Sequence, residues 1–323
     1  MKDTTKFTLS GFGALAGALS LGSAGASYLV MRELAGGRRQ TYDEAFKWQR
    51  EHSDFSWFSE EDLRRYTITA LDGYVLHAAY LPAREQSDRF MILTHGYTDN
   101  MYGSLKYARL YLDLGFHLVV YDLRGHGENE PHFCSYTIFE SQDLLAVIED
   151  TKKRFHPALI GLHGESLGAS TTVAALGKLQ DQCKESGEQP DAEESNAKIA
   201  FAVSDCGFAD FEMLTRYLMK RRSLPESVAR GASAMMKLRY GHSFSEMRPA
   251  LSLRSNHIPV LFFHGSEDTL IPPVHSSIMH RENCGYSEFH IIPGAKHAAS
   301  ILTDRQRYEK YVSAFVKNVL KES

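Results

Sequence analysis

Residues 159–169 read Leu-Ile-Gly-Leu-His-Gly-Glu-Ser-Leu-Gly-Ala, and the predicted fold is organised around them. An apolar run leads into the turn Gly164-Glu165-Ser166-Leu167-Gly168, and residues 170–176 continue with a helical pattern. Gly-x-Ser-x-Gly between a buried strand and a helix is typical of a nucleophile elbow, where small neighbours allow a tight turn that exposes the serine hydroxyl. We therefore predict that Ser166 is a nucleophile; the alternative is a glycine-rich turn with an idle serine.

Apolar strand-like runs alternate with helical patterns on both sides of this stretch. Helices are predicted over 105–114, 141–155, 170–179, 274–281 and 301–320, and strands over 66–69, 74–81, 90–94, 117–122, 158–162, 199–204, 260–264 and 288–292. Leu71-Asp72-Gly73 is a hairpin signal between the first two strands. The alternation predicts an α/β protein with a mostly parallel eight-stranded sheet and helices on both faces.

Two segments interrupt this alternation. Residues 184–196 are rich in polar residues and glycine, which predicts a solvated surface loop. Residues 208–257 have apolar side chains at helical spacing, which predicts a compact helical insertion that acts as a lid over the carboxyl ends of the strands. Its larger apolar side chains are expected to pack, either around a pocket or in the core: Met213, Leu214, Tyr217, Leu218, Met235, Met236, Leu238 and Tyr240.

The N-terminal residues differ in composition from the rest of the chain. Residues 7–31 contain no charged side chain and would span about 37 Å as a helix, enough to cross a bilayer. We predict a membrane anchor or signal segment over 1–35, a linker and amphipathic helix over 36–62, and a catalytic domain over 63–323. Lys2, Lys6 and the small residues 24–26 also fit a cleaved export signal, and the flanking charges do not indicate the side of the membrane.

Composition excludes some other functions. The formal net charge is −4 and the pI is about 6.4, so there is no basic surface of the kind that binds nucleic acid. The four cysteines, Cys134, Cys183, Cys206 and Cys284, form no pattern with metal-ligand spacing. We predict no metal and no organic cofactor; disulfides remain possible if the protein is exported.

A serine nucleophile needs a base, and the base needs a carboxylate to orient it. In chain order the acid should follow the serine and the histidine should come last. Asp268 follows the predicted strand 260–264, and His297 follows the last predicted strand. We therefore predict Asp268 as the acid and His297 as the base, with Asp205 and Glu267 as alternative acids.

A tetrahedral intermediate also needs two hydrogen-bond donors for its oxyanion. The backbone amide of Leu167, directly after the nucleophile, is one candidate. The second should come from the loop after strand 90–94, which reads His95-Gly96-Tyr97-Thr98-Asp99.

Five motifs together resemble the α/β-hydrolase superfamily over most of the chain from residue 66 onward. They are Thr94-His95-Gly96-Tyr97, Asp122-Leu123-Arg124-Gly125-His126-Gly127, Gly164-Glu165-Ser166-Leu167-Gly168, His264-Gly265-Ser266-Glu267-Asp268 and Gly294-Ala295-Lys296-His297. Within the superfamily the chain most resembles bacterial serine-aminopeptidase-like hydrolases with an N-terminal membrane segment. The resemblance implies a Ser166, Asp268 and His297 triad, with the amides of Tyr97 and Leu167 as the oxyanion hole. The motif at 122–127 is interpreted as a structural turn.

These observations predict a serine hydrolase that cleaves a carboxylic ester, or an amide or thioester, through an acyl-enzyme on Ser166. Its partner is a small-molecule acyl substrate. The alternatives are an acyltransferase that uses the same acyl-enzyme, and a non-catalytic, membrane-tethered ligand-binding protein. We expect a protein anchored in the membrane by its N-terminal segment, or secreted after cleavage. The sequence leaves the substrate and the oligomeric state open.

Overall fold

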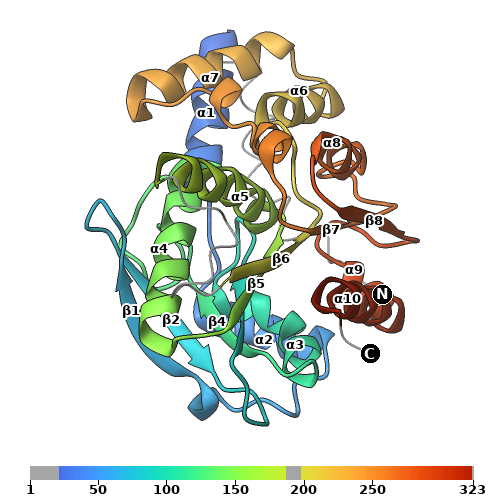
Figure 1. Ribbon diagram of the computed structural model, residues 1–323. Coiled ribbons are helices and arrows are strands. Elements are labelled where there is room, and N and C mark those ends of the chain that lie inside the picture. Colours follow the sequence, from blue (N-terminus) through green and yellow to red (C-terminus); the bar gives the residue numbers. More distant parts are fainter. Residues whose placement is uncertain (1–21, 187–197, 322–323) are drawn as a thin grey trace.

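The computed structural model describes residues 22–186 and 198–321, which fold around one twisted sheet (Figure 1). The strands are β1 (Arg64–Thr69), β2 (Val75–Leu81), β3 (Arg89–Thr94), β4 (His117–Tyr121), β5 (Leu159–Glu165), β6 (Lys198–Asp205), β7 (Val260–Gly265) and β8 (Ser287–Ile292). They lie in the order β1-β2-β4-β3-β5-β6-β7-β8. β2 pairs antiparallel with β1 and β4, and the other neighbours are parallel. The predicted eight-stranded, mostly parallel sheet is confirmed.

Burial explains why the sheet has this form. Every residue of β7 is buried, as expected for a parallel strand covered by helices on both faces. In the edge strand β1 only Ile68 is buried. β1 and β2 form the antiparallel hairpin at this edge of the sheet. The turn of the hairpin places Gly73 at φ +87°, a conformation that glycine adopts without a steric penalty.

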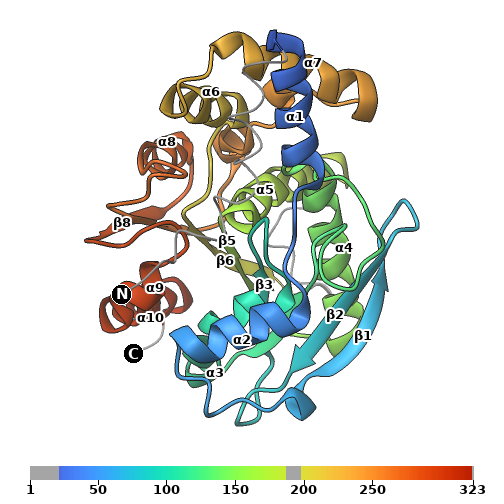
Figure 2. The same cartoon turned by 180° about the vertical axis from the view of Figure 1, so that it is seen from behind.

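Helices cover both faces of the sheet (Figures 1 and 2). Their bounds are α1 (Gly22–Gly36), α2 (Tyr42–His52), η3 (Glu60–Asp62), η4 (Met101–Tyr107), α3 (Ala108–Asp113), α4 (Ile138–Phe155), α5 (Leu167–Ser186), α6 (Phe211–Arg221), α7 (Glu226–Tyr240), η5 (Phe244–Glu246), η6 (Pro249–Ser255), α8 (Val274–Glu282), α9 (Ser300–Thr303) and α10 (Arg305–Leu320). One core lies under α4, α5 and α8 and continues into α1, α6 and α7. The other lies under α2, α3 and α10. Ile92 and Leu93 of β3 point into different cores, as alternate residues of a strand must.

Local capping sets the helix boundaries and explains two departures from the predicted ranges. The helix predicted over 105–114 is preceded by η4, because the Asn100 side chain accepts a hydrogen bond from the Tyr102 amide and starts a turn earlier. The helix predicted over 301–320 is divided at Asp304, whose carboxylate caps α10 through the Arg307 amide. The predicted loop 184–196 begins inside α5, and its residues beyond 186 lie outside the described part of the chain.

The insertion predicted over 208–257 is helical and contains α6, α7, η5 and η6. Leu214, Leu218 and Met236 are buried, as expected. Met213 and Leu238 are 39% and 90% exposed, so the expectation that they pack was wrong for both. Leu238 lies in the last turn of α7, on the face that points away from the core.

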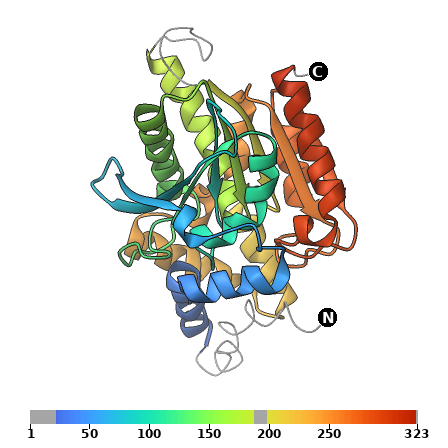
Figure 3. The ribbon, with the colours of Figure 1, turned by 90° about the horizontal axis from the view of Figure 1, so that it is seen from below.

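The N-terminal helix α1 packs against α7 (Figures 1 and 3). Residues 22–31 of the predicted membrane segment belong to this helix, and Ala26, Val30 and Met31 are buried in the core. Residues 1–21 lie outside the described residues, so the membrane anchor stays a prediction. Within residues 22–186 and 198–321, no helix is both long and apolar enough to cross a membrane.

The segment between α1 and the sheet also packs against the rest of the chain. Helix α2 begins at a capping box formed by Thr41 and Glu44, and its Ala45 is buried in the core under α3 and α10. Phe55, in the loop that follows, joins the same core.

Candidate active site

Ser166 lies in the turn between β5 and α5, where the motif Gly164-x-Ser166-x-Gly168 places it. Its φ of +55° is unusual for a residue with a side chain, and its neighbours Glu165 and Leu167 are buried while Ser166 is partly exposed. A Cβ on Gly164 would lie 2.1 Å from the Gly168 carbonyl oxygen, and a Cβ on Gly168 would lie 2.1 Å from the Thr94 carbonyl oxygen. Both positions therefore require glycine.

The structure brings Ser166, His297 and Asp268 together in a chain of hydrogen bonds. His297 lies in the loop after β8, and its Nε2 is 2.8 Å from Oγ of Ser166. Asp268 lies in the loop after β7, and its Oδ2 is 2.7 Å from Nδ1 of His297. The carboxyl ends of β5, β7 and β8 meet at one edge of the sheet, which places the three loops side by side.

Asp268 is held as a carboxylate by its surroundings. Its Oδ1 accepts hydrogen bonds of 2.9 Å from the amides of Leu270 and Ile271. Nε2 of His264 lies 3.2 Å from Oδ2. Burial alone would raise the pKa of Asp268, but the charge of His297 and the hydrogen bonds from His264 and His297 hold this pKa well below its usual range.

The pKa of His297 is shifted in the opposite direction to that of Asp268. Burial alone would lower the pKa of His297, but the charge of Asp268 and its hydrogen bond raise this pKa above the ordinary value. A carboxylate on Nδ1 also fixes the tautomer, because Nδ1 carries the proton and Nε2 is left to accept one from Ser166.

The two alternative acids do not contact His297 in this arrangement. Glu267 is exposed. Asp205 is buried at the end of β6, where its Oδ1 accepts a hydrogen bond of 2.9 Å from Ser300 Oγ. Burial and the charge of Glu165 raise the pKa of Asp205 to about 6. Of the three acids considered, only Asp268 has the required geometry.

The oxyanion candidates lie beside the serine. A Cβ on Gly96 would approach Cβ of Ser166 to 3.4 Å, so the loop after β3 passes directly beside Ser166. Among the described residues, none accepts a hydrogen bond from the backbone amide of Tyr97 or of Leu167. The two N–H groups thus remain candidates for the predicted oxyanion hole.

A buried charged cluster below the triad was missed by the sequence analysis. Nζ of Lys106 forms an ion pair with the Glu165 carboxylate and lies 3.0 Å from the Ala298 carbonyl oxygen. The hydroxyl of Tyr107 donates to Glu165 at 2.6 Å and lies 3.2 Å from the Asp205 carboxylate. Burial alone would lower the pKa of Lys106, but Glu165 raises this pKa above its ordinary value. The cluster therefore joins the residue before Ser166 to the residue after His297.

The motif at residues 122–127 has the structural role expected of it. The Asp122 carboxylate accepts hydrogen bonds from the amides of Met101 (2.8 Å) and Glu128 (3.1 Å). Arg124 donates to both carboxylate oxygens of Asp143, at 2.9 and 2.6 Å. These bonds pin the turn after β4 to η4 and α4.

Cys206, Asp268 and His297 form the one group of potential metal ligands found among the described residues, with ligand atoms within 4.8 Å of one another. Two of the three are already hydrogen-bonded to each other, and burial raises the pKa of the Cys206 thiol well above its ordinary value. A protonated thiol is a poor metal ligand. The described Cys134, Cys206 and Cys284 are free thiols.

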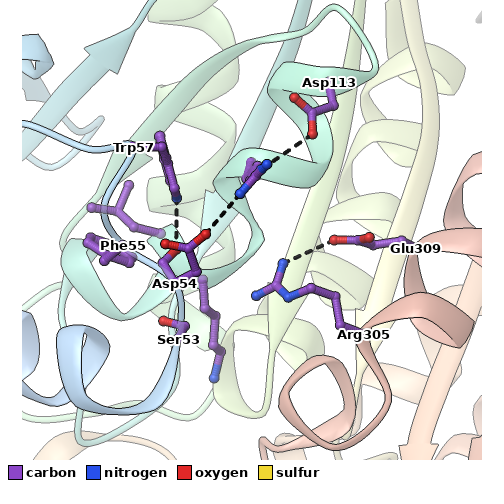
Figure 4. A pocket seen from close by; sticks show the side chains of 10 residues that line it. Ser53, Asp54, Phe55, Trp57, Asp113, Arg305 and Glu309 are labelled. Atoms are coloured by element: carbon purple, nitrogen blue, oxygen red, sulfur yellow. Dashed lines mark hydrogen bonds and ion pairs between the residues drawn. The ribbon is translucent and has the colours of Figure 1, made fainter.

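A cavity of about 310 Å³ lies between the loop after α2, helix α3 and helix α10 (Figure 4). Its charged side chains are already paired: Arg109 with Asp54 at 3.1 Å, and Arg305 with Glu309 at 3.0 Å. No triad residue lines this cavity, so it is not the place where an acyl group would meet Ser166.

Comparisons with known proteins agree with this fold. The family described as "Serine aminopeptidase, S33" matches residues 85–186. The uncharacterized protein YqkD of Bacillus subtilis is 31% identical over 271 residues, which cover 83% of this chain and 84% of YqkD. The solved structures that share the fold include Pf2001 and Est1E. The Pyrococcus furiosus esterase Pf2001 aligns with a TM-score of 0.62 at 20% identity, and the alignment covers 81% of this chain and 94% of the Pf2001 chain. Est1E of Butyrivibrio proteoclasticus, solved with ferulic acid bound, aligns with a TM-score of 0.60 at 18% identity, and the alignment covers 79% of this chain and 99% of the Est1E chain.

The sheet order and the strand–turn–helix around Ser166 define an α/β-hydrolase fold. Within that superfamily, the chain belongs to the serine aminopeptidase S33 family. The family name does not itself fix the reaction, because one fold supports many chemistries.

Proposed function

We propose that this protein is a serine hydrolase that cleaves carboxylic esters through an acyl-enzyme on Ser166. One observation carries the proposal: Oγ of Ser166, both nitrogens of His297 and the carboxylate of Asp268 form a continuous hydrogen-bonded chain, with spacings of 2.8 and 2.7 Å. This is the geometry that turns a weakly nucleophilic hydroxyl into a reactive one.

The proposed reaction has two halves. In the first, Ser166 Oγ attacks the ester carbonyl carbon while Nε2 of His297 takes the hydroxyl proton, and the resulting oxyanion accepts hydrogen bonds from the amides of Tyr97 and Leu167. When the carbon–oxygen bond to the alcohol breaks, His297 returns the proton to the departing oxygen. In the second half, His297 takes a proton from water, the hydroxide attacks the acyl carbon, and the acid leaves as Ser166 regains its proton.

The substrate class is proposed from the structural neighbours. Pf2001 is described as an esterase, and Est1E was solved with ferulic acid, an aromatic carboxylic acid, bound. These neighbours support a carboxylic ester as the substrate, with amides and thioesters as less favoured substrates.

The proposal is tested with the full-length protein and a series of p-nitrophenyl esters of increasing acyl length. We expect hydrolysis of at least one ester, and a loss of at least about 10³-fold in kcat/KM for Ser166→Ala. Glu267→Gln is the matched control, since Glu267 is exposed near the site and should leave the activity unchanged. Full activity in Ser166→Ala would refute the proposal. Adding an acceptor alcohol separates hydrolysis from acyl transfer, because only transfer yields a new ester.

A further inference from the structure

Tyr97 connects the site around Ser166 to the N-terminal helix. Its backbone belongs to the loop that passes beside Ser166, while its hydroxyl reaches the carboxyl end of α1. The hydroxyl lies 2.8 Å from the Glu33 carbonyl oxygen and 2.9 Å from that of Leu34, and it accepts a hydrogen bond of 3.0 Å from the Gly37 amide. The side chain is therefore held by three backbone groups of a segment about 60 residues earlier in the chain.

The end of a helix is a suitable anchor for a hydroxyl donor. The last carbonyl groups of a helix have no partner within the helix and carry partial negative charge. Here the one proton of the Tyr97 hydroxyl is shared between the Glu33 and Leu34 carbonyl oxygens. The Glu33 carbonyl also accepts a hydrogen bond of 2.9 Å from the Gly37 amide, and the Leu34 carbonyl accepts one of 3.0 Å from the Tyr136 hydroxyl. The segment after α1 also contacts the next residue of the Tyr97 loop. The Gln40 amide donates a hydrogen bond of 2.8 Å to the Thr98 carbonyl oxygen.

Helix α1 is in turn fixed against the lid. A Cβ on Gly231 of α7 would lie 2.3 Å from Oγ of Ser27, so the two helices approach as closely as a glycine allows. Leu34 and Ala35, in the last turn of α1, are buried in the same core as the lid residues. Figures 1 and 2 show α1 and α7 side by side from opposite directions. Helix α1, whose carboxyl end contacts the Tyr97 hydroxyl, is therefore fixed by its packing against α7 and the core.

We propose that the carboxyl end of α1 is part of the catalytic site: through the hydroxyl of Tyr97 it sets the position of the Tyr97 amide that receives the oxyanion. Tyr97 then has two roles, as an oxyanion donor through its N–H and as a positioning residue through its side chain. This inference rests on the proposed serine hydrolase function. Its physical basis is that an oxyanion donor acts only when it is already placed about 2.7–3.1 Å from the developing charge.

The test compares Tyr97→Phe with Tyr136→Phe in the full-length protein, with a p-nitrophenyl ester as substrate. Both replacements keep the aromatic ring and remove one hydroxyl, and the Tyr136 hydroxyl also donates to the Leu34 carbonyl oxygen, at 3.0 Å. Tyr136 carries no proposed oxyanion amide. We expect Tyr97→Phe to lower kcat by about 10- to 100-fold with KM within about twofold, the size of effect that a small misplacement of a catalytic group produces. Tyr136→Phe should stay within about threefold of the unmodified protein in both constants.

A second readout separates positioning from a general loss of structure. A trifluoromethyl ketone adds to the serine and places an oxyanion in the same site, so its inhibition constant should rise with the loss in kcat/KM for Tyr97→Phe. A normal kcat and inhibition constant for Tyr97→Phe would overturn the inference, and so would equal losses in both variants. These failures differ from failure of the proposed function, which is a fully active Ser166→Ala variant.

Discussion

Oγ of Ser166 lies 2.8 Å from Nε2 of His297, a residue 131 positions further along the chain. The contact depends on two loops at one edge of the sheet, the elbow after β5 and the loop after β8. Neither side chain reacts alone, since the hydroxyl needs a base and the imidazole needs a partner on its other nitrogen.

Replacing Asp268 by Asn should keep the fold and remove most of the activity. The amide cannot hold His297 in the tautomer that accepts a proton from Ser166, and the same substitution in a serine protease lowered kcat by about 10⁴-fold. Ester hydrolysis by Asp268→Asn and by the control Asp205→Asn should be measured side by side. If Asp205→Asn had the larger effect on kcat and a normal unfolding temperature, Asp268 would not be the acid.

The activity should rise with pH through the titration of His297. Asp268 raises the pKa of His297 above its ordinary value of 6.5. Below that pKa the imidazole is protonated and cannot accept the serine proton, so kcat/KM should increase with pH through a midpoint above about 6.5. In Asp268→Asn the carboxylate that favours the charged imidazole is absent, and the midpoint of the residual activity should move to lower pH. A midpoint that does not differ between the two proteins would contradict this assignment.

Gly168→Ala should destabilise the protein, because the new methyl group would lie 2.1 Å from a backbone oxygen of β3 that has no room to move. We expect a loss of about 1–3 kcal/mol or more in the free energy of unfolding, the usual cost of overpacking, together with a loss of activity. Gly36→Ala is the matched control, since nothing lies within 4 Å of its added Cβ. Urea unfolding of both variants measures the difference, and equal stabilities would show that the elbow tolerates a side chain.

Lys106→Met should destabilise the fold by removing the cation beside Glu165. The Lys106 and Glu165 side chains are only 3% and 7% exposed, and breaking a buried pair costs about 3–5 kcal/mol. The double variant Lys106→Met with Glu165→Gln should recover part of that loss, because no buried charge is then left unpaired. For comparison, Arg84→Met removes an exposed ion pair with Asp113 and should change the unfolding free energy by less than about 1 kcal/mol. Equal effects of Lys106→Met and Arg84→Met would contradict the role given to the buried pair.

The sequence predicted those features of the fold that depend on local pattern. Apolar runs marked the strands, and the glycines around Ser166 marked the elbow, because each signal lies within a few consecutive residues. The choice of Asp268 and His297 followed from their place after particular strands. The catalytic role of the three residues remains a prediction.

Contacts between distant segments were not predictable in the same way. Lys106 lies within a predicted helix, and nothing near it indicated a partner 59 residues later at Glu165. The packing of α1 was also missed. Small and apolar residues in 22–35 suit close contact with another helix as well as they suit a bilayer, and only the structure shows Val30 and Met31 buried in the core.

Labelling with a fluorophosphonate probe tests the central claim most directly, because the probe reacts only with a serine whose hydroxyl has been activated. The folded full-length protein should take up one probe molecule, and peptide mass spectrometry should place it on Ser166. Labelling should disappear in Ser166→Ala and after denaturation, and it should slow markedly in His297→Ala. Folded protein that stays unlabelled, or a label on another serine with Ser166 unmodified, would contradict the account.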